Sequence, residues 1–309
     1  MIKQKKTTTL IEAFEEFMLF KRASTLSEKT NFDYDQVIGF FLKHNGLTGK
    51  EPITIITEQY ILSWIVKMQD MDLKLSSINH YIGDIRVFCY WLMKRDFIKS
   101  FKINLLKGQQ PNMRYFTDDE VAILVQKPPK DCNFTEFRTY VAICFVLATG
   151  ARASTLINIK ISDIDFTARE IVYAHLKNKK SMIVPLSPAL ASVLQEYLRM
   201  WSREKESGWL FCGTDESQCT VSALHQALWT YCDKRGIRSK GMHALRHSFA
   251  RGYIINGGNA LKLQKILTHS TLEMTKRYVQ LFGDDLKRDY EQFSPLDNSI
   301  SYGKISRRK

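Results

Sequence analysis

Helical periodicity in the first third of the chain constrains its fold most strongly. Apolar side chains recur every three or four residues through four successive stretches, "TTTLIEAFEEFMLFKRA", "LSEKTNFDYDQVIGFFLKH", "TEQYILSWIVKMQ" and "LSSINHYIGDIRVFCYWLMKRDFI". This spacing places them on one face of each predicted helix. Short polar connections separate the stretches, and there is almost no strand signal. Residues 1–105 are therefore predicted to form a small helical domain.

A change of composition marks the next boundary. Residues 106–113, "LKGQQPNM", contain a glycine, a proline and polar amides without an apolar period, which is typical of a linker. The stretch "YFTDDEVAILVQ" then restarts a helix, with Thr117 as its N-cap and acidic residues in its first turn. We expect a second domain over residues 114–295, followed by a polar tail over 296–309 that is mobile or partner-bound.

The second domain has a mixed pattern. "FRTYVAICFVLATGARASTLINI" indicates a buried helix, a break at Thr149 and Gly150, and a second helix. Two β-rich runs, "IVYAHL" and "SMIVPLS", flank the basic "KNKK" and predict a hairpin with a basic tip. Helical periodicity then returns; we expect Gly236 to cap "SALHQALWTYCDKR" and His269 to end "ALKLQKILTH". The predicted fold is mainly α, with a small β-sheet or hairpin in the C-terminal domain.

Charge and cysteine content limit the class of protein. The 309 residues carry a formal net charge of +13, which favours a polyanionic partner, either nucleic acid or an anionic membrane surface. No apolar run reaches the roughly 18 residues of a membrane span. Glutamates stand where a signal peptide would need an apolar stretch, which predicts a cytoplasmic protein. The six cysteines form no CxxC pair, so we expect packing residues in a reducing compartment and no zinc site.

Six side chains of the second domain suit chemistry on a phosphodiester: Arg152, Lys177, His243, Arg246, His269 and Tyr278. Arginine forks neutralise non-bridging oxygens with a bidentate geometry that lysine cannot match. A lysine can protonate a departing alkoxide, and an imidazole can take the proton of the nucleophile. A tyrosine hydroxyl can attack phosphorus and hold it as an ester. Such a set needs no metal ion, because the cationic side chains replace it.

Each of these residues also has an ordinary interpretation. Arg152 alone could be a surface residue at a helix start, Lys177 a solvated turn lysine, and His247 a packing or hydrogen-bonding histidine. His243 and His247 could be two metal ligands on one helix face. No glutamate lies between them and no third ligand is evident, so we expect no metal and no cofactor. The indication of function lies in the whole set and its order along the chain.

The motifs that hold this set resemble those of the tyrosine recombinase, or phage integrase, family. "ATGARASTL" is similar to the first arginine motif, "HLKNKKSMIVPL" to the lysine hairpin, "HALRHSFA" to the His-x-x-Arg motif, "ILTHS" to the second histidine and "RYVQL" to the nucleophile. His269 and Tyr278 keep the family's spacing of nine residues. The resemblance covers nearly the whole chain, because "YFTDDEV" resembles the start of the catalytic domain and residues 76–98 resemble the last helix of the helical core-binding domain.

The resemblance implies a role for each residue. These are phosphate binding by Arg152 and Arg246, general acid catalysis on the 5′-hydroxyl by Lys177, general acid/base catalysis by His243, a hydrogen bond to the phosphate from His269, and a 3′-phosphotyrosyl bond at Tyr278. Religation would then need neither ATP nor a metal. Four protomers would act on two double-stranded DNA sites through a Holliday junction, with residues 1–105 as the core-DNA-binding domain and 114–295 as the catalytic domain. An accessory DNA-bending or excision factor is a further candidate partner, and the region after about residue 284 would dock on a neighbouring protomer.

The sequence departs from the family's pattern in one important place. Three residues after Arg152 relatives usually have an acid, which can support the active-site cations, but this chain has Thr155. "Leu-Thr-His" for "Leu-Gly-His" and Met182 for an arginine are milder departures. We expect His247 to support the site from beside Arg246. None of the principal catalytic residues is missing, so an active enzyme is predicted.

Two other functions stay open at this point. A type IB topoisomerase would use similar chemistry to relax supercoils, and an integrase-like regulator would bind DNA without catalysis. The DNA target is also open, as is the choice among integration or excision, dimer resolution and inversion. We favour a mobile-element role, because Thr155 fits a housekeeping enzyme less well.

Overall fold

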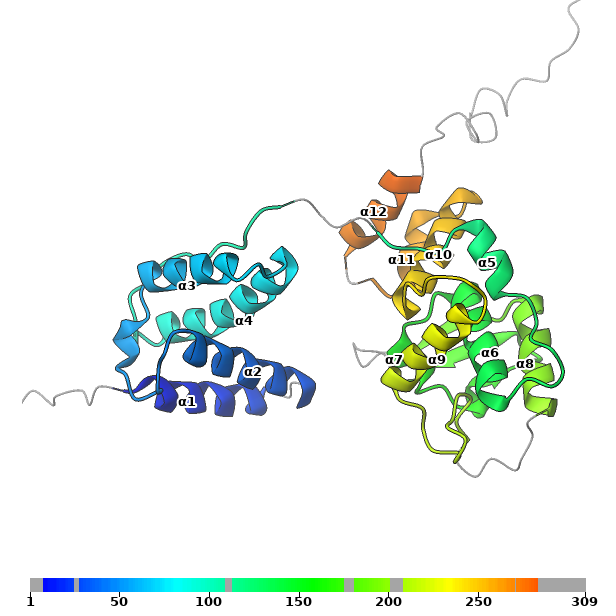
Figure 1. Ribbon diagram of the computed structural model, residues 1–309, viewed down its shortest axis with the longest axis horizontal. Helices are drawn as coiled ribbons and strands as arrows, with labels where there is room; N and C mark the ends of the chain where they lie inside the picture. Colours follow the sequence, from blue (N-terminus) through cyan, green and yellow to red (C-terminus); the bar gives the residue numbers. More distant parts are fainter. Residues whose placement is uncertain are drawn as a thin grey trace, which may run out of the picture. The chain divides into compact units, whose positions relative to one another are not determined.

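The computed structural model describes residues 8–24, 28–108, 113–174, 181–200, 208–269 and 271–282. The chain divides into two compact units, residues 1–111 and 112–309 (Figure 1). None of the helices in the described ranges combines the length and the apolar character that crossing a membrane requires.

The first unit consists of helices, as predicted from its periodicity. These are α1 (Leu10–Ala23), α2 (Glu28–His44), α3 (Glu58–Asp70) and α4 (Leu75–Lys94), with a short 3-10 turn at Ile53–Ile55. Thr9 caps α1 in a reciprocal arrangement with Glu12, and Thr57 caps α3. The apolar faces pack into one core in which aromatic rings meet edge to face; the ring centroids of Phe17 and Phe88 lie 5.1 Å apart.

The second unit is mixed, with helices around a small sheet (Figure 1). Its helices are α5 (Asp118–Leu124), α6 (Phe134–Thr149), α7 (Ala153–Leu156), α8 (Pro188–Met200), α9 (Val221–Asp233), α10 (Met242–Ile255), α11 (Ala260–Ile266) and α12 (Leu272–Phe282). Strands β1 (Ile164–Asp165), β2 (Glu170–Tyr173) and β3 (Met182–Pro185) form an antiparallel sheet in that order, with Ile171 opposite Val184. The predicted hairpin is β2–β3, whose tip at 175–180 lies outside the described residues.

Helix α6 is the centre of the second unit. It is apolar on nearly every side and contacts α8, α9 and α10, which explains why its sequence has no polar face. The helix ends at Gly150, whose φ of +68° is a left-handed conformation that favours glycine. A Cβ atom there would lie 2.5 Å from Phe249 and 2.7 Å from Leu267. Glycine therefore lets α10 and the end of α11 approach the turn that leads to Arg152.

The structure corrects three local expectations. The second helix predicted after Gly150 is only the single turn α7. Helix α11 ends at Ile266, because Thr268 adopts a φ of +50°, so His269 lies beyond the helix. The C-cap of α9 is Lys234; Gly236 follows it with a φ of +65° and closes the turn after the helix. The predicted cap at Thr117 is confirmed, with Glu120 completing the capping box.

Candidate active site

Five of the six predicted site residues lie in the described part of the chain, and the structure brings them together. Arg152 follows the end of α6, His243 and Arg246 lie on α10, His269 lies between α11 and α12, and Tyr278 lies on α12. Helices α10, α11 and α12 contact one another, and α10 also contacts α6. Lys177 lies outside the described residues, as does the tail over 296–309. The cluster therefore joins segments that are more than 100 residues apart in sequence.

Helix α10 is fixed against the start of the unit. The N–H of Phe116 donates to the hydroxyl of Ser248 at 2.8 Å, in the interior. Near the surface the guanidinium of Arg251 donates to Asp118 at 2.5 Å. These contacts hold α10 on one side. The helix can therefore carry His243, Arg246 and His247 in fixed positions next to α12.

Arg246 is held by main-chain carbonyls. Its guanidinium donates from Nη1 to the carbonyl of Gly150 at 2.6 Å and from Nη2 to that of Leu267 at 2.5 Å. Burial, and then the charge of Arg152, lowers its pKa to about 10, which leaves it cationic at neutral pH. A guanidinium has about five N–H groups, so these two bonds orient the fork and leave capacity for an anion.

Arg152 is held by a hydroxyl. Its Nη1 donates to Oγ1 of Thr268 at 2.5 Å, a contact that the left-handed turn at Thr268 makes possible. Burial lowers the pKa of Arg152 without neutralising it. The buried Thr155 donates its backbone N–H to the carbonyl of Arg152 at 2.9 Å, so it fixes the local backbone without supplying a carboxylate.

His269 is a buried, neutral imidazole. Its Nδ1 lies 2.9 Å from Oγ1 of the fully buried Thr275. Burial, followed by the charges of Arg246 and Arg152, lowers its pKa to about 4. Its ring lies parallel to that of Tyr278, with centroids 6.2 Å apart. If Thr275 donates to Nδ1, the remaining proton is on Nε2, which makes His269 a donor.

Tyr278 is the most enclosed member of the cluster. It is only 2% exposed, and its hydroxyl lies 2.7 Å from Nδ1 of His247. Burial raises its pKa, and the opposing charges of Arg246, Arg277 and Arg152 do not cancel this. The side chain is therefore a phenol at neutral pH.

His243 is the exposed member of the cluster. Its ring meets that of His247 edge to face, with centroids 4.6 Å apart. Partial burial, then Arg246 and Arg152, lowers its pKa. Tyr173, at the end of β2, raises the pKa of Arg246 through its charge, so the base of the hairpin that carries Lys177 also lies close to the cluster.

Several contributing residues were not predicted. Thr268 and Thr275 position Arg152 and His269, and the carbonyl of Gly150 positions Arg246. The sequence offered one signal, the break at Thr149 and Gly150. It predicted the end of a helix, but it did not indicate that the carbonyl of Gly150 accepts a hydrogen bond from Arg246. His247 was expected to support the site, and it contacts Tyr278 directly.

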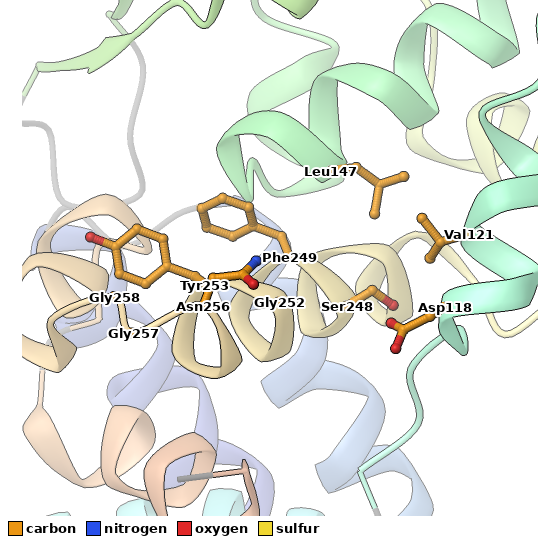
Figure 2. A pocket seen from close by; sticks show the side chains of 10 residues that line it. All are labelled: Asp118, Val121, Leu147, Ser248, Phe249, Gly252, Tyr253, Asn256, Gly257 and Gly258. Carbon is orange, nitrogen blue, oxygen red and sulfur yellow. The ribbon is translucent and has the colours of Figure 1, made fainter. Parts of the chain in front are cut away.

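A cavity of about 530 Å³ lies on another face of α10 and is distinct from this cluster. Figure 2 shows its lining side chains, which include Asp118, Leu147, Phe249 and Tyr253 and none of the predicted site residues. Within the described ranges, no three His, Cys, Asp or Glu side chains gather as a metal site would require. The cluster thus places two cationic side chains near a phenol, and it suits an anionic reactant.

Known proteins are similar to this chain in sequence and in fold. The profile of the phage integrase family matches residues 114–283. Tyrosine recombinase XerC of Pediococcus pentosaceus is 25% identical over 297 residues, covering 93% of this chain and 98% of the relative. Tyrosine recombinase XerA of Pyrococcus furiosus is 25% identical, covering 96% and 99%. The integrase of Escherichia phage 186 is 32% identical over 205 residues, covering 62% and 53%.

Solved structures support the fold. The Tn1549 transposon integrase in complex with transposon right end DNA has a TM-score of 0.74 at 18% identity, covering 88% of this chain and 94% of that one. A lambda integrase tetramer bound to a Holliday junction has a TM-score of 0.71 at 15% identity, covering 98% and 82%.

Proposed function

The chain belongs to the phage integrase family and is a site-specific tyrosine recombinase, and from this premise we propose that Tyr278 is its nucleophile, forming a 3′-phosphotyrosyl bond with DNA. One observation carries the proposal: the turn at Leu267 and Thr268 holds both Arg246 and Arg152, and the next residue, His269, has its ring parallel to that of Tyr278. Two fixed cations beside a phenol are what attack on a phosphodiester needs.

Each residue has a role that follows from its contacts. Arg152 and Arg246 are fixed by Thr268 and by two carbonyls, so they bind the scissile phosphate in one orientation. His269 donates a hydrogen bond from Nε2 to a phosphate oxygen, because Thr275 occupies its Nδ1. In this proposal the hydrogen bonds within the protein orient each side chain, and its remaining N–H groups bind the phosphate.

Two roles rest on the resemblance alone. Lys177 protonates the departing 5′-oxygen, and His243 acts as a general acid/base at the phosphate. The phosphotyrosyl ester keeps the energy of the broken phosphodiester, so religation to a second strand needs neither ATP nor a metal.

We assign the first unit to the DNA core site and the second to catalysis. The net charge of +13 suits binding to phosphates, and the lambda integrase structure is a tetramer on a Holliday junction, so we propose four protomers acting on two DNA duplexes. The likeness to the integrase of Escherichia phage 186 favours integration and excision of a mobile element. We place the protein in the cytoplasm, where that DNA lies.

Covalent trapping tests the proposal. A library of nicked duplexes with a randomised core is incubated with the full chain, and adducts that survive denaturation are recovered and sequenced. Wild-type protein should capture a subset of duplexes, and Tyr278→Phe should bind them without any adduct. Tyr253→Phe, at a tyrosine of α10 that lines the cavity in Figure 2, is the matched control and should capture DNA normally. An adduct in Tyr278→Phe would remove Tyr278 from this role.

A second assay separates the recombinase from a topoisomerase. Supercoiled plasmid that lacks the captured sequence should remain supercoiled with the wild-type protein, because strand exchange requires the site. Efficient relaxation of that plasmid would favour the topoisomerase. Site-specific binding without any adduct would favour a non-catalytic regulator.

A further inference from the structure

The nucleophile has a hydrogen-bond partner that the family resemblance did not assign. In the described chain the hydroxyl of Tyr278 lies 2.7 Å from Nδ1 of His247, while His243, expected to be the general acid/base, contacts the ring of His247. His247 thus stands between His243 and Tyr278. A side chain in direct contact with the reacting oxygen can do more than support the site.

We propose that His247 is a catalytic residue: its Nδ1 orients the hydroxyl of Tyr278 and accepts its proton as the oxygen attacks phosphorus. This inference rests on the proposed function, and it assigns to His247 the proton transfer at the nucleophile. His243 keeps the role at the phosphate that the resemblance implies.

The protonation states fit this direction of transfer. Burial, followed by the charges of His243, Arg246 and Arg277, lowers the pKa of His247 to about 4, so the ring is neutral at neutral pH. A neutral imidazole with an acceptor at Nδ1 carries its proton on Nε2. The hydrogen bond then runs from the Tyr278 hydroxyl, which donates, to Nδ1, which accepts.

The surroundings of His247 are cationic or neutral on every element that faces it. The charged and titratable groups are His243 and Arg246 on α10, Arg277 and Tyr278 on α12, and His269 before α12. No carboxylate is among these groups, so His247 is not held as an imidazolium before the reaction. As the phosphate enters, its negative charge offsets these cations and raises the affinity of His247 for a proton.

Attack by Tyr278 requires a group that accepts its phenolic proton. The pKa of Tyr278 is raised by burial, so the free phenol is a weak nucleophile at neutral pH. In the cleavage step the bond between Tyr278 Oη and phosphorus forms, the bond between phosphorus and the 5′-oxygen breaks, and the phenolic proton passes to His247. The 5′-oxygen takes a proton from the acid assigned to Lys177. In religation His247 returns its proton to the departing Tyr278.

A test without DNA examines the hydrogen bond. With 3-fluorotyrosine placed at position 278 of the full chain, fluorine NMR reports the environment of the phenol. We expect His247→Phe to shift this resonance and His247→Asn to restore part of it, because an asparagine oxygen takes nearly the place of Nδ1. His225→Asn, at an exposed position of α9, should leave the resonance unchanged. A resonance that His247→Phe does not move would overturn the positioning role.

A second test examines proton transfer with the duplexes that wild-type protein captures. Under single-turnover conditions, His247→Phe and His247→Asn should form adduct at least about 100-fold more slowly at neutral pH. Both should then speed up about tenfold per pH unit as hydroxide replaces the missing base, whereas the wild-type profile stays flatter. His225→Asn should keep the wild-type slope, and circular dichroism confirms that each variant is folded.

The outcomes separate this inference from the proposed function. If wild-type protein forms adduct and both His247 variants match its rate and its pH slope, His247 is not the proton acceptor. If His247→Asn recovers both the resonance and the wild-type rate, His247 only positions the hydroxyl. If wild-type protein forms no adduct with any duplex, the role of Tyr278 itself fails, and the proton transfer fails with it.

Discussion

The interiors of the two units differ in chemistry. In the described chain every buried polar or charged residue belongs to the second unit: Arg138, Thr139, Thr149, Thr155, Arg246, Ser248, His269 and Thr275. The buried residues of the first unit are hydrophobic, and Trp64 is the largest of those fully buried. Apolar burial stabilises a fold directly, whereas a buried polar group costs free energy unless it finds a partner. The interior of the second unit therefore depends on specific hydrogen bonds, several of which hold the cluster around Tyr278 in place.

The largest change in stability should come from the core of the first unit. Trp64→Ala should lower its free energy of unfolding by about 3 to 5 kcal/mol, because a large buried side chain leaves a cavity. Urea unfolding followed by hydrogen exchange would measure this. The fluorine resonance at position 278 should not change, and a change there would show that the two interiors are not independent.

Arg246→Lys should have the second-largest effect, lowering both the free energy of unfolding and the rate of adduct formation. Lysine keeps the charge but cannot bond to the carbonyls of Gly150 and Leu267 together, so we expect a loss of about 2 kcal/mol. Adduct formation should fall at least about 100-fold. Arg251→Lys is the matched control, because its surface contact with Asp118 is worth about 1 kcal/mol or less. Near-normal adduct formation by Arg246→Lys would contradict an oriented phosphate fork.

Thr275→Val should have a smaller effect. The change keeps the volume and removes the hydroxyl that lies 2.9 Å from His269 Nδ1. We expect a loss of about 1 kcal/mol and about tenfold slower adduct formation, since the proton on His269 is no longer directed to Nε2. Thr139→Val, on α6, controls for the loss of a threonine hydroxyl and should not slow the reaction. Equal rates in both variants would argue against the donor role of His269.

The smallest expected effect is a difference between the units in the pH at which each loses stability on acidification. His247 and His269 have pKa values lowered from 6.5 to about 4, so their stabilisation is complete above pH 6.5 and is lost as the pH falls towards 4. In the first unit, hydrogen bonds from the backbone of Thr48 lower the pKa of Glu51 from 4.5 to about 2, so that contribution is lost only below pH 4.5. Hydrogen exchange by mass spectrometry should show the second unit losing protection at the higher pH, and the reverse order would contradict this.

Much of the fold follows from periodicity and caps. The helices of the first unit, the cap at Thr117 and the β2–β3 hairpin were predicted, because amphipathic spacing and turn residues are local signals. Strand β1 has only two residues, and α7 is a single turn, so neither is long enough to show a period. The position of His269 beyond α11 depends on a positive φ at Thr268, which side-chain pattern does not reveal.

The site was predicted unevenly for a similar reason. Motif order and the nine-residue spacing identified Arg152, Arg246, His269 and Tyr278, which the structure brings together. The contacts that orient them are single hydrogen bonds across long sequence separations, such as Arg152 to Thr268 over 116 residues. Tertiary packing alone creates such pairs. The same holds for His247. Its position in the sequence indicated that it supports the site, and only the packing of α10 against α12 reveals its contact with Tyr278.

The 2% exposure of Tyr278 limits which DNA can reach its hydroxyl. A phosphodiester is bulkier than a water molecule, so a phenol that water scarcely reaches is closed to DNA that merely collides with the protein. Cutting then requires the side chains that cover the hydroxyl to move enough to admit a strand, while the contact between Tyr278 and His247 is kept. A hydroxyl that is covered in the free protein disfavours cleavage at unrelated sequences, because DNA must first bind well enough to uncover it.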